Sequence, residues 1–279
     1  MEVLIVENPS SKGIAGRLFF VLFCGATLVF FLFPLFWVLL MALKDPDTAQ
    51  AMPPKFIFTP TLENFQRVLQ EGDFLKATWN SVLVAIFSLA AALIIGLPAS
   101  YVIARRRQKW LSFGILFTQM APWVVFLLPW YILFKRLGLV DTHLALVLTN
   151  LTYLVPFTVW LMLGFFEDVP TEVEEAAWLD GCSHLGTFVR VVLPLVKGGV
   201  ITVCTLGFMF AWNIFIFPLV LSGGKTRTLP VLVYGFMADN SLDFGPLAAA
   251  SVLITLPVII FVLLNQKHFS LGIALGGRK

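Results

Sequence analysis

The sequence predicts an all-α protein with six membrane-spanning helices, and three observations support this fold class. Of the 279 residues, 59% are hydrophobic and only 13% are charged, whereas a soluble domain carries about 45–50% apolar and about 25% charged residues. Six long stretches lack every charged residue and histidine. The three cysteines are odd in number and widely spaced, which argues against a disulfide-rich secreted domain. The chain is therefore expected to lie in a lipid bilayer.

Each uncharged stretch is long enough to cross a membrane. The predicted spans are 18–43, 77–104, 110–134, 144–166, 198–224 and 244–266. All of them exceed the roughly 20 apolar residues that a helix needs to cross the hydrocarbon core. The first span is also longer than the apolar part of a signal peptide, about 7–15 residues, so we expect it to be retained.

An even number of spans places both termini on the same side of the membrane. Arg105, Arg106 and Arg107 occupy the short loop after the second span, and short cytoplasmic loops carry an excess of Lys and Arg. We therefore expect both termini in the cytoplasm, with a cytoplasmic segment 1–17 and a cytoplasmic tail 267–279 flanking the transmembrane domain 18–266.

The polar groups inside the spans are amides and hydroxyls. No ionisable side chain lies there, although proton relays, ion-coupled carriers and voltage sensors place such groups inside the membrane. A carrier driven by an ion gradient is therefore disfavoured. Asn80, Asn150 and Asn213 are the candidates for a solute pathway, where they would bond a neutral hydroxylated solute. The alternative, which we prefer for each residue taken alone, is that these amides join neighbouring helices.

The sequence carries no motif for catalysis, metal binding or nucleic-acid binding. Histidines 143, 184 and 268 are isolated in loops, and the net charge of +3 is spread over scattered residues. Gly224, Lys225 and Thr226 resemble the end of a phosphate-binding loop, but Leu219 stands where its first glycine is required. We therefore expect that this chain hydrolyses nothing by itself and binds no cofactor.

The outer loop 44–76 is predicted to contain a short surface helix. Leu62, Phe65 and Leu69 recur at positions i, i+3 and i+7, which is the spacing of one helix face. This helix would either bind a soluble partner or lie on the bilayer.

The inner loop 167–197 is built as two short helices joined by a turn. Thr171 followed by Glu174 predicts a capping box that starts a helix at Glu172. Gly181 is the natural residue to end it, because glycine adopts the left-handed conformation that turns the chain. A second helix is expected over 183–193, ending at Pro194.

This loop also carries a family resemblance. Glu175, Ala176, Ala177 and Gly181, followed by Val191, Leu193 and Pro194, follow the pattern E-A-A-x-x-x-G with I-x-L-P after it. The loop resembles the signature loop of the membrane permease subunits of bacterial binding-protein-dependent ABC importers, and its fuller form is similar to the MalG-like permeases of carbohydrate uptake. The stretches 34–37, 137–142 and 211–213 and the tail 271–279 also resemble this family, whereas Gly198 and the Gly-Gly-Arg-Lys ending depart from it.

The resemblance implies a type I ABC importer permease fold in the bacterial inner membrane. It implies a homologous second permease, two copies of a cytoplasmic ATPase subunit that hold the ATP and Mg²⁺, and an extracytoplasmic binding protein. The last delivers a sugar or related polyhydroxylated solute. The loop would be the coupling helix that contacts the ATPase. The residues that the resemblance assigns to this contact are Glu174, Glu175, Ala176, Ala177, Asp180 and Gly181.

Two other functions compete with this expectation. An ion-gradient-driven carrier or channel would transport without an ATPase, and the uncharged spans disfavour it. An intramembrane enzyme or an assembly scaffold would need a catalytic pair or a large soluble domain, and the sequence contains neither.

Overall fold

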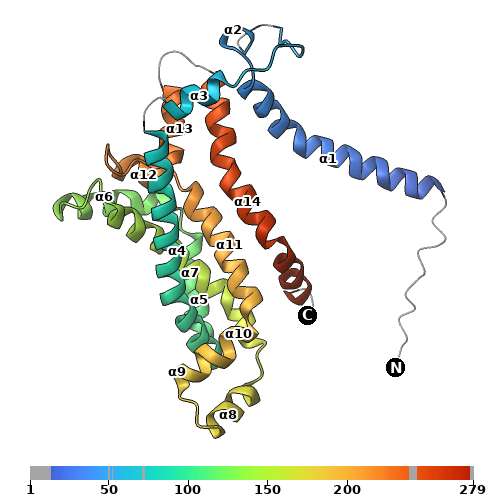
Figure 1. Ribbon diagram of the computed structural model, residues 1–279. Helices are drawn as coiled ribbons and strands as arrows, with labels where there is room; N and C mark the ends of the chain where they lie inside the picture. Colours follow the sequence, from blue (N-terminus) through green and yellow to red (C-terminus); the bar gives the residue numbers. More distant parts are fainter. Residues whose placement is uncertain (1–13, 50, 52, 71–72, 239–243, 277–279) are drawn as a thin grey trace. The chain divides into compact units, whose positions relative to one another are not determined.

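The computed structural model describes residues 14–49, 51, 53–70, 73–238 and 244–276, and within these ranges the chain is helical with no strand (Figure 1). The helices are α1 (Ile14–Ala42), α2 (Pro46–Ala49), α3 (Glu63–Gln70), α4 (Phe74–Arg105), α5 (Lys109–Met120), η2 (Trp123–Phe126), α6 (Leu127–Arg136), α7 (His143–Glu167), α8 (Thr171–Leu179), α9 (His184–Thr187), η3 (Phe188–Val192), α10 (Leu193–Leu195), α11 (Lys197–Asn213), α12 (Ile216–Leu221), α13 (Leu229–Ala238) and α14 (Phe244–Gly276). The predicted all-α class is confirmed.

Five helical segments of the described chain are long and apolar enough to cross a membrane. They are Gly16–Ala42, Phe74–Arg105, His143–Glu167, Lys197–Leu221 and Phe244–Asn265. The predicted third span is not one straight helix, because Trp110–Met120 and Trp123–Arg136 meet at a bend of 87°. This pair makes a sixth span if both halves cross the bilayer together.

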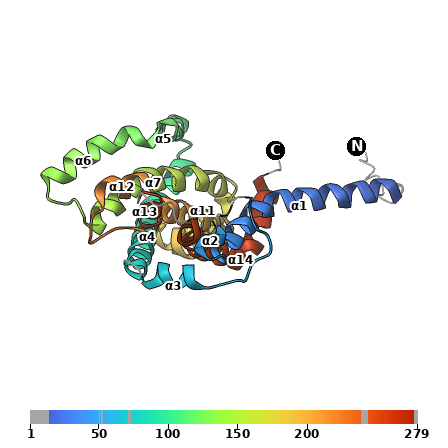
Figure 2. The ribbon, with the colours of Figure 1, turned by 90° about the horizontal axis from the view of Figure 1, so that it is seen from above.

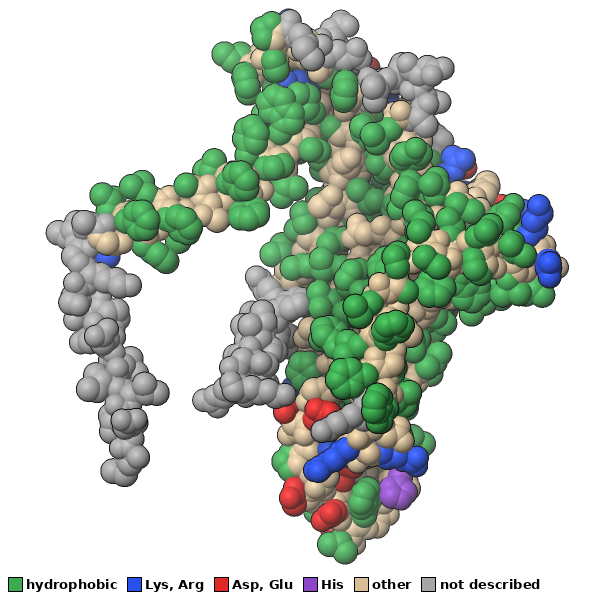
Figure 3. Space-filling view, turned by 180° about the vertical axis from the view of Figure 1, so that it is seen from behind, with side chains coloured by type: hydrophobic (Ala, Val, Ile, Leu, Met, Phe, Trp, Pro, Cys, Tyr) green, Lys and Arg blue, Asp and Glu red, His purple; other side chains and the backbone are tan. Residues whose placement is uncertain are grey.

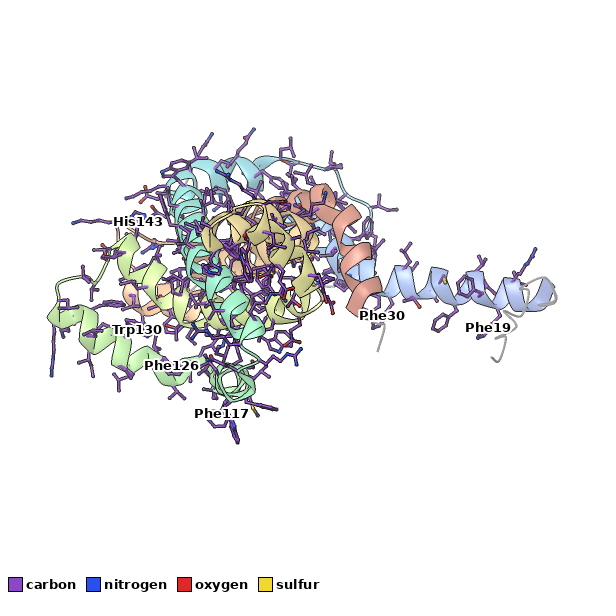
Figure 4. The ribbon with its side chains drawn as sticks, turned by 90° about the horizontal axis from the view of Figure 1, so that it is seen from below. Phe19, Phe30, Phe117, Phe126, Trp130 and His143 are labelled. Carbon is purple, nitrogen blue, oxygen red and sulfur yellow. The ribbon has the colours of Figure 1, made fainter. Side chains whose placement is uncertain are left out.

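Proline explains the bend in the third span. Ala121 has extended backbone angles, φ −70° and ψ 129°, and is followed by Pro122. A proline lacks the N–H that a helix interior requires, and it pushes the residue before it out of the helical region. Figure 4 labels Phe117 on α5 before the bend, and Phe126 and Trp130 after it.

The chain divides into two compact units. One comprises Met1–Arg67 with Asp243–Val252, and the other comprises Val68–Leu242 with Leu253–Lys279. In the first unit Lys44 is buried, with its ammonium group 5.4 Å from the centre of the Trp37 ring and 5.3 Å from that of Phe58. The Asn64 amide donates to the carbonyls of Ala42 and Lys44. The helix expected around Leu62 to Leu69 is present as α3.

The second unit is built around α4, α7 and α11, which pack along one another (Figures 1 and 2). Small residues permit this close approach: Ala92 and Ala211 are buried where the three helices meet. At Gly96 a Cβ atom would lie 2.7 Å from the Thr158 Cγ2 atom, so α4 and α7 are nearly in backbone contact there. Trp212 of α11 is buried and donates its indole N–H to the Ile254 carbonyl of α14.

Candidate functional site

The inner loop begins with α8, a helix of nine residues that starts at Thr171. Pro170 precedes it as the N-cap residue, and no side chain caps the helix. The predicted capping box is therefore wrong, although the predicted helix is present within one residue. The physical reason is that the Glu174 side chain is engaged elsewhere and does not fold back onto the helix start.

Glu174 is bonded to the end of α4. Arg105 Nε donates to Glu174 Oε1 at 2.6 Å, and a second guanidinium nitrogen, Nη2, contacts the same oxygen. The Tyr101 hydroxyl donates to Glu174 Oε2 at 2.5 Å. The side chains of Arg105 and Glu174 are only 17% and 3% exposed. We call Tyr101, Arg105 and Glu174 the polar clasp.

The clasp distinguishes Glu174 from the other residues that the resemblance assigns to the ATPase contact. Its carboxylate is buried and paired with this chain's own Arg105, and a direct contact with the ATPase stays a prediction. Tyr101 and Arg105 were missed at the sequence level, where Arg105 entered only as a mark of membrane orientation. Their spacing of four residues on an apolar helix was the available signal, because it places both on one face.

The remaining predicted residues of α8 divide between surface and interior. Glu175, Ala176 and Asp180 are exposed, whereas Ala177 is buried. The apolar side chains Trp178 and Leu179 are also exposed, Leu179 by 90%. We call Glu175, Ala176, Trp178, Leu179 and Asp180 the α8 face. Acidic, basic and apolar side chains gather together at this end of the bundle (Figure 3).

Gly181 ends α8 as predicted. Its φ is +85°, in the left-handed region that favours glycine. The Gly181 N–H donates to the Trp178 carbonyl, and the Cys182 N–H donates to the Ala177 carbonyl. These two bonds form a complete Schellman motif, which satisfies carbonyls at the helix end and reverses the chain.

The second arm is more irregular than the predicted helix over 183–193. The Ser183 hydroxyl accepts from the Gly186 N–H and starts α9, which continues into a π-helical turn, η3, before α10. Pro194 lies within α10, so the helix does not stop there. A π-turn immediately before a proline fits its missing N–H, because the usual bond to the fourth preceding carbonyl cannot form.

Aromatic packing fastens this second arm to α4 and α7. The Phe188 ring lies 5.0 Å from the Tyr101 ring and 6.1 Å from the Phe166 ring, measured between centroids. Phe166, Phe188 and Val192 belong to one buried apolar cluster that joins α4, α7, η3 and α11. The second arm is therefore packed onto the transmembrane bundle through Phe188 and Val192, whereas the α8 face is exposed.

The three candidate pathway asparagines do not lie together. Asn80 is buried and donates to the carbonyls of Lys225 and Arg227, while its Oδ1 lies 2.8 Å from His143 Nε2; Figure 4 labels His143. Asn150 is buried and donates to Ser88 Oγ. Both amides thus hold helices and loops together, as in the alternative interpretation. Asn213 alone is exposed, and its pathway role stays a prediction.

The Gly-Lys-Thr segment that resembles a phosphate loop encloses a carboxylate of the chain itself. Asp141 Oδ1 accepts from the Gly223 N–H, the Thr226 N–H and the Thr226 hydroxyl, and Oδ2 accepts from the Lys225 N–H. Burial raises the pKa of the Asp141 carboxyl, but the hydrogen bonds from Thr226, Gly223 and Lys225 outweigh it and the pKa lies below its usual value. The loop 222–227 is therefore folded around Asp141, at the end of the bundle opposite to α8 (Figure 1).

The chain is similar in sequence and fold to known transport proteins. The family model described as "Binding-protein-dependent transport system inner membrane component" matches residues 88–274. A probable ABC transporter permease, y4oR of Sinorhizobium fredii, is 33% identical over 278 residues, covering 99% of this chain and 100% of that one. The diacetylchitobiose uptake permease DasC of Streptomyces coelicolor is 32% identical over 255 residues, covering 88% and 91%. A crystal structure of a bacterial alginate-importing ABC transporter matches with a TM-score of 0.78 at 22% identity, covering 92% of this chain and 98% of that chain.

Proposed function

We propose that α8 is the helix through which a cytoplasmic ATPase subunit drives transport. The premise is that the chain belongs to the family of binding-protein-dependent transport system inner membrane components and is a permease subunit of an ABC importer. The observation that carries this proposal is the α8 face. It presents a 90% exposed leucine and a 40% exposed tryptophan beyond the end of the transmembrane helices. Apolar side chains displayed in this way are characteristic of a protein contact.

The chemistry of this face defines the partner surface. The exposed carboxylates of Glu175 and Asp180 flank the apolar tip, so a complementary ATPase surface would be an apolar cleft with basic residues at its rim. A cleft of about 540 Å³ also lies beside α8, lined by Arg105, Arg106, Trp178 and His184 among others. It is large enough to receive side chains of the partner.

The proposed contact with an ATPase implies an orientation in the membrane. An ATPase acts in the cytoplasm, so the α8 end of the bundle would be cytoplasmic, together with Arg105, Arg106 and Arg107. The excess of positive charge in that short loop supports the same orientation. Both termini of this inner-membrane chain would then be cytoplasmic, and the loop 222–227 would face outward.

The opposite end of the bundle would receive the solute-binding protein. The loop 222–227 is held by Asp141, and Lys225 and Arg227 are exposed on it. Lys135 and Arg136 at the end of α6 are exposed as well. This basic surface suits an acidic face of the binding protein, because complementary charge steers encounter and fixes orientation.

The solute is proposed to be a sugar or a related polyhydroxylated compound, as the name of the relative DasC suggests. The fifth span is interrupted at Ile214 and Phe215, between α11 and α12. This break and the bend in the third span both adjoin Tyr153 in the middle of α7. Trp123 after one break and Phe210 before the other contact its ring at 4.3 and 5.0 Å. The exposed amide of Asn213 ends α11 beside them. Aromatic faces with amides suit sugars, and broken membrane helices commonly flank transport sites.

The complete importer would comprise this chain, a homologous second permease, two ATPase copies and the binding protein. ATP and Mg²⁺ would act in the ATPase subunits, because this chain carries no nucleotide motif. The energy for transport would therefore reach the solute pathway through contact with α8.

Copurification tests this function. The tagged full chain is purified from its native membrane, and the ATPase subunit recovered with it is quantified. Glu175→Arg and Leu179→Asp should reduce this recovery, whereas Glu167→Arg, a matched change at an exposed carboxylate at the end of α7, should not. Equal recovery from all variants would refute the contact through α8. A panel of di- and oligosaccharides, diacetylchitobiose among them, then identifies the solute by stimulation of ATP hydrolysis.

A further inference from the structure

Helix α4 is bonded to functional segments at both of its ends. It runs without a break from Phe74 to Arg105, a length of about 48 Å at 1.5 Å per residue. One end meets α8 and the other meets the loop 222–227 and the start of α13 (Figure 1).

The polar clasp fixes α8 to the cytoplasmic end of α4. Besides its contacts with Glu174, Arg105 donates from Nη1 to the Val169 carbonyl at 3.0 Å. Val169 lies in the short linker between α7 and α8. A linker of this kind would by itself let α8 swivel, but one guanidinium group holds both the linker and the helix. A displacement of α8 is therefore transferred to α4.

Side chains at the outer end of α4 hold the opposite loop. Asn80 donates to the carbonyls of Lys225 and Arg227 at 3.1 and 3.0 Å. Lys76 Nζ donates to the Gly224 carbonyl at 2.8 Å, and Ser81 Oγ accepts from the Leu229 N–H at 2.7 Å. Backbone groups of the loop 222–227 and of the start of α13 are thus bonded directly to side chains of α4.

The middle of α4 is suited to move as one body. The close approach at Gly96 locks α4 against Thr158 of α7, and Ala92 is fully buried there. Densely packed interiors transmit displacement with little compression. The third span is broken at Ala121 and Pro122 and the fifth at Ile214 and Phe215. In contrast, α4 continues through Pro98, with Ser100 donating to the Gly96 and Leu97 carbonyls.

We propose that α4 acts as a rigid rod that carries the movement of α8 across the membrane to the loop 222–227. The polar clasp is its cytoplasmic joint. The bonds of Lys76, Asn80 and Ser81 form its outer joint. This inference rests on the proposed contact between α8 and an ATPase. It assigns Tyr101, Arg105 and Glu174 a positioning role, because none of them needs to touch the solute or the nucleotide.

Interspin distances in the purified complex test the proposal. Cys24, Cys182 and Cys204 are replaced by serine, and nitroxide labels are placed at Lys225→Cys and Lys135→Cys, whose side chains are exposed at the outer end. Addition of MgATP and vanadate to the complex of the full chain with its partner subunits should shift the distance between the labels. Glu174→Gln, which keeps the shape of the side chain and removes its charge, should abolish this shift while trapped nucleotide stays unchanged.

The controls separate the rod from the docking contact. Glu167→Gln changes an exposed carboxylate at the same membrane side and should keep the full shift. Tyr101→Phe removes one hydrogen bond of the clasp and should reduce the shift, which keeps the test decisive if Glu174→Gln fails to assemble. A full shift in both clasp variants, or a parent complex that traps nucleotide without any shift, would overturn the rod. A chain that recovers no ATPase would instead overturn the proposed function.

Discussion

Arg105 at the end of α4 and Glu174 in α8 form a buried ion pair although they are 69 positions apart in the sequence. Long-range pairing of this kind fixes the position of α8 relative to the membrane bundle. It also distinguishes Glu174, which is buried and bonded within the chain, from Glu175 and Asp180 of the α8 face, which are exposed.

Removing one member of this pair should loosen α8. Glu174→Ala leaves a guanidinium group buried without its counter-charge, which typically costs about 3–5 kcal/mol. We expect faster amide hydrogen exchange in residues 171–181 and a lower unfolding temperature of the purified chain. Arg105→Ala should have a similar effect, and the double variant should be less destabilised than the sum of the two. Strict additivity of the two effects would contradict a direct pair.

Gly181 should tolerate no side chain without a functional cost. A substituted residue must adopt φ near +85°, and the left-handed region costs roughly 1–2 kcal/mol for residues with a Cβ atom. Gly181→Val should therefore displace the turn after α8 and uncouple ATP hydrolysis from solute uptake, while the helical content measured by circular dichroism stays unchanged. Gly164→Ala, at a helix position with open space, is the control. Normal coupling in a membrane-inserted Gly181→Val chain would contradict the assignment of this turn.

Asp141 should make the outer loop sensitive to acid. A carboxyl whose pKa is lowered by folding stabilises the fold above its ordinary pKa of 3.8, and this contribution is lost as the pH falls through the lowered value. At neutral pH, Asp141→Asn should therefore speed proteolysis or hydrogen exchange of residues 222–227. Asp141 has a φ of +60°, which asparagine also adopts readily, so the variant tests the charge and not the backbone. The difference from the parent should disappear at strongly acidic pH, and a difference that persists there would point to shape instead.

Close packing of α4 on α7 predicts a cost at Gly96. An alanine Cβ would lie 2.7 Å from Thr158 Cγ2, a buried β-branched side chain that has little freedom to move. Overpacking of this size typically destabilises by about 1–3 kcal/mol. Gly96→Ala should lower the unfolding temperature, whereas Gly114→Ala, which meets no neighbour, should not. Equal unfolding temperatures would show that α4 and α7 can separate readily.

Local sequence signals predicted local structure well. Gly181 predicted the turn after α8, because the residue type and its place after a helical stretch are enough to predict such a turn. The spacing of Leu62, Phe65 and Leu69 likewise predicted α3 from neighbouring residues alone. Pro122 lies at the bend in the third span. The uncharged composition of 110–134 indicates only that this segment is long enough to cross a membrane and does not locate the bend.

The sequence by itself determined the membrane environment, the helical class and the presence of a displayed inner helix, since hydropathy, proline and glycine act over a few neighbouring residues. Tertiary structure alone decided what the polar side chains do. Glu174 turned inward because Arg105 and Tyr101 lie beside it, and Asn80 and Asn150 became helix and loop contacts because their partners come from distant segments. A buried charge or amide takes whatever partner the fold brings within about 3 Å, and no spacing along the chain specifies that partner.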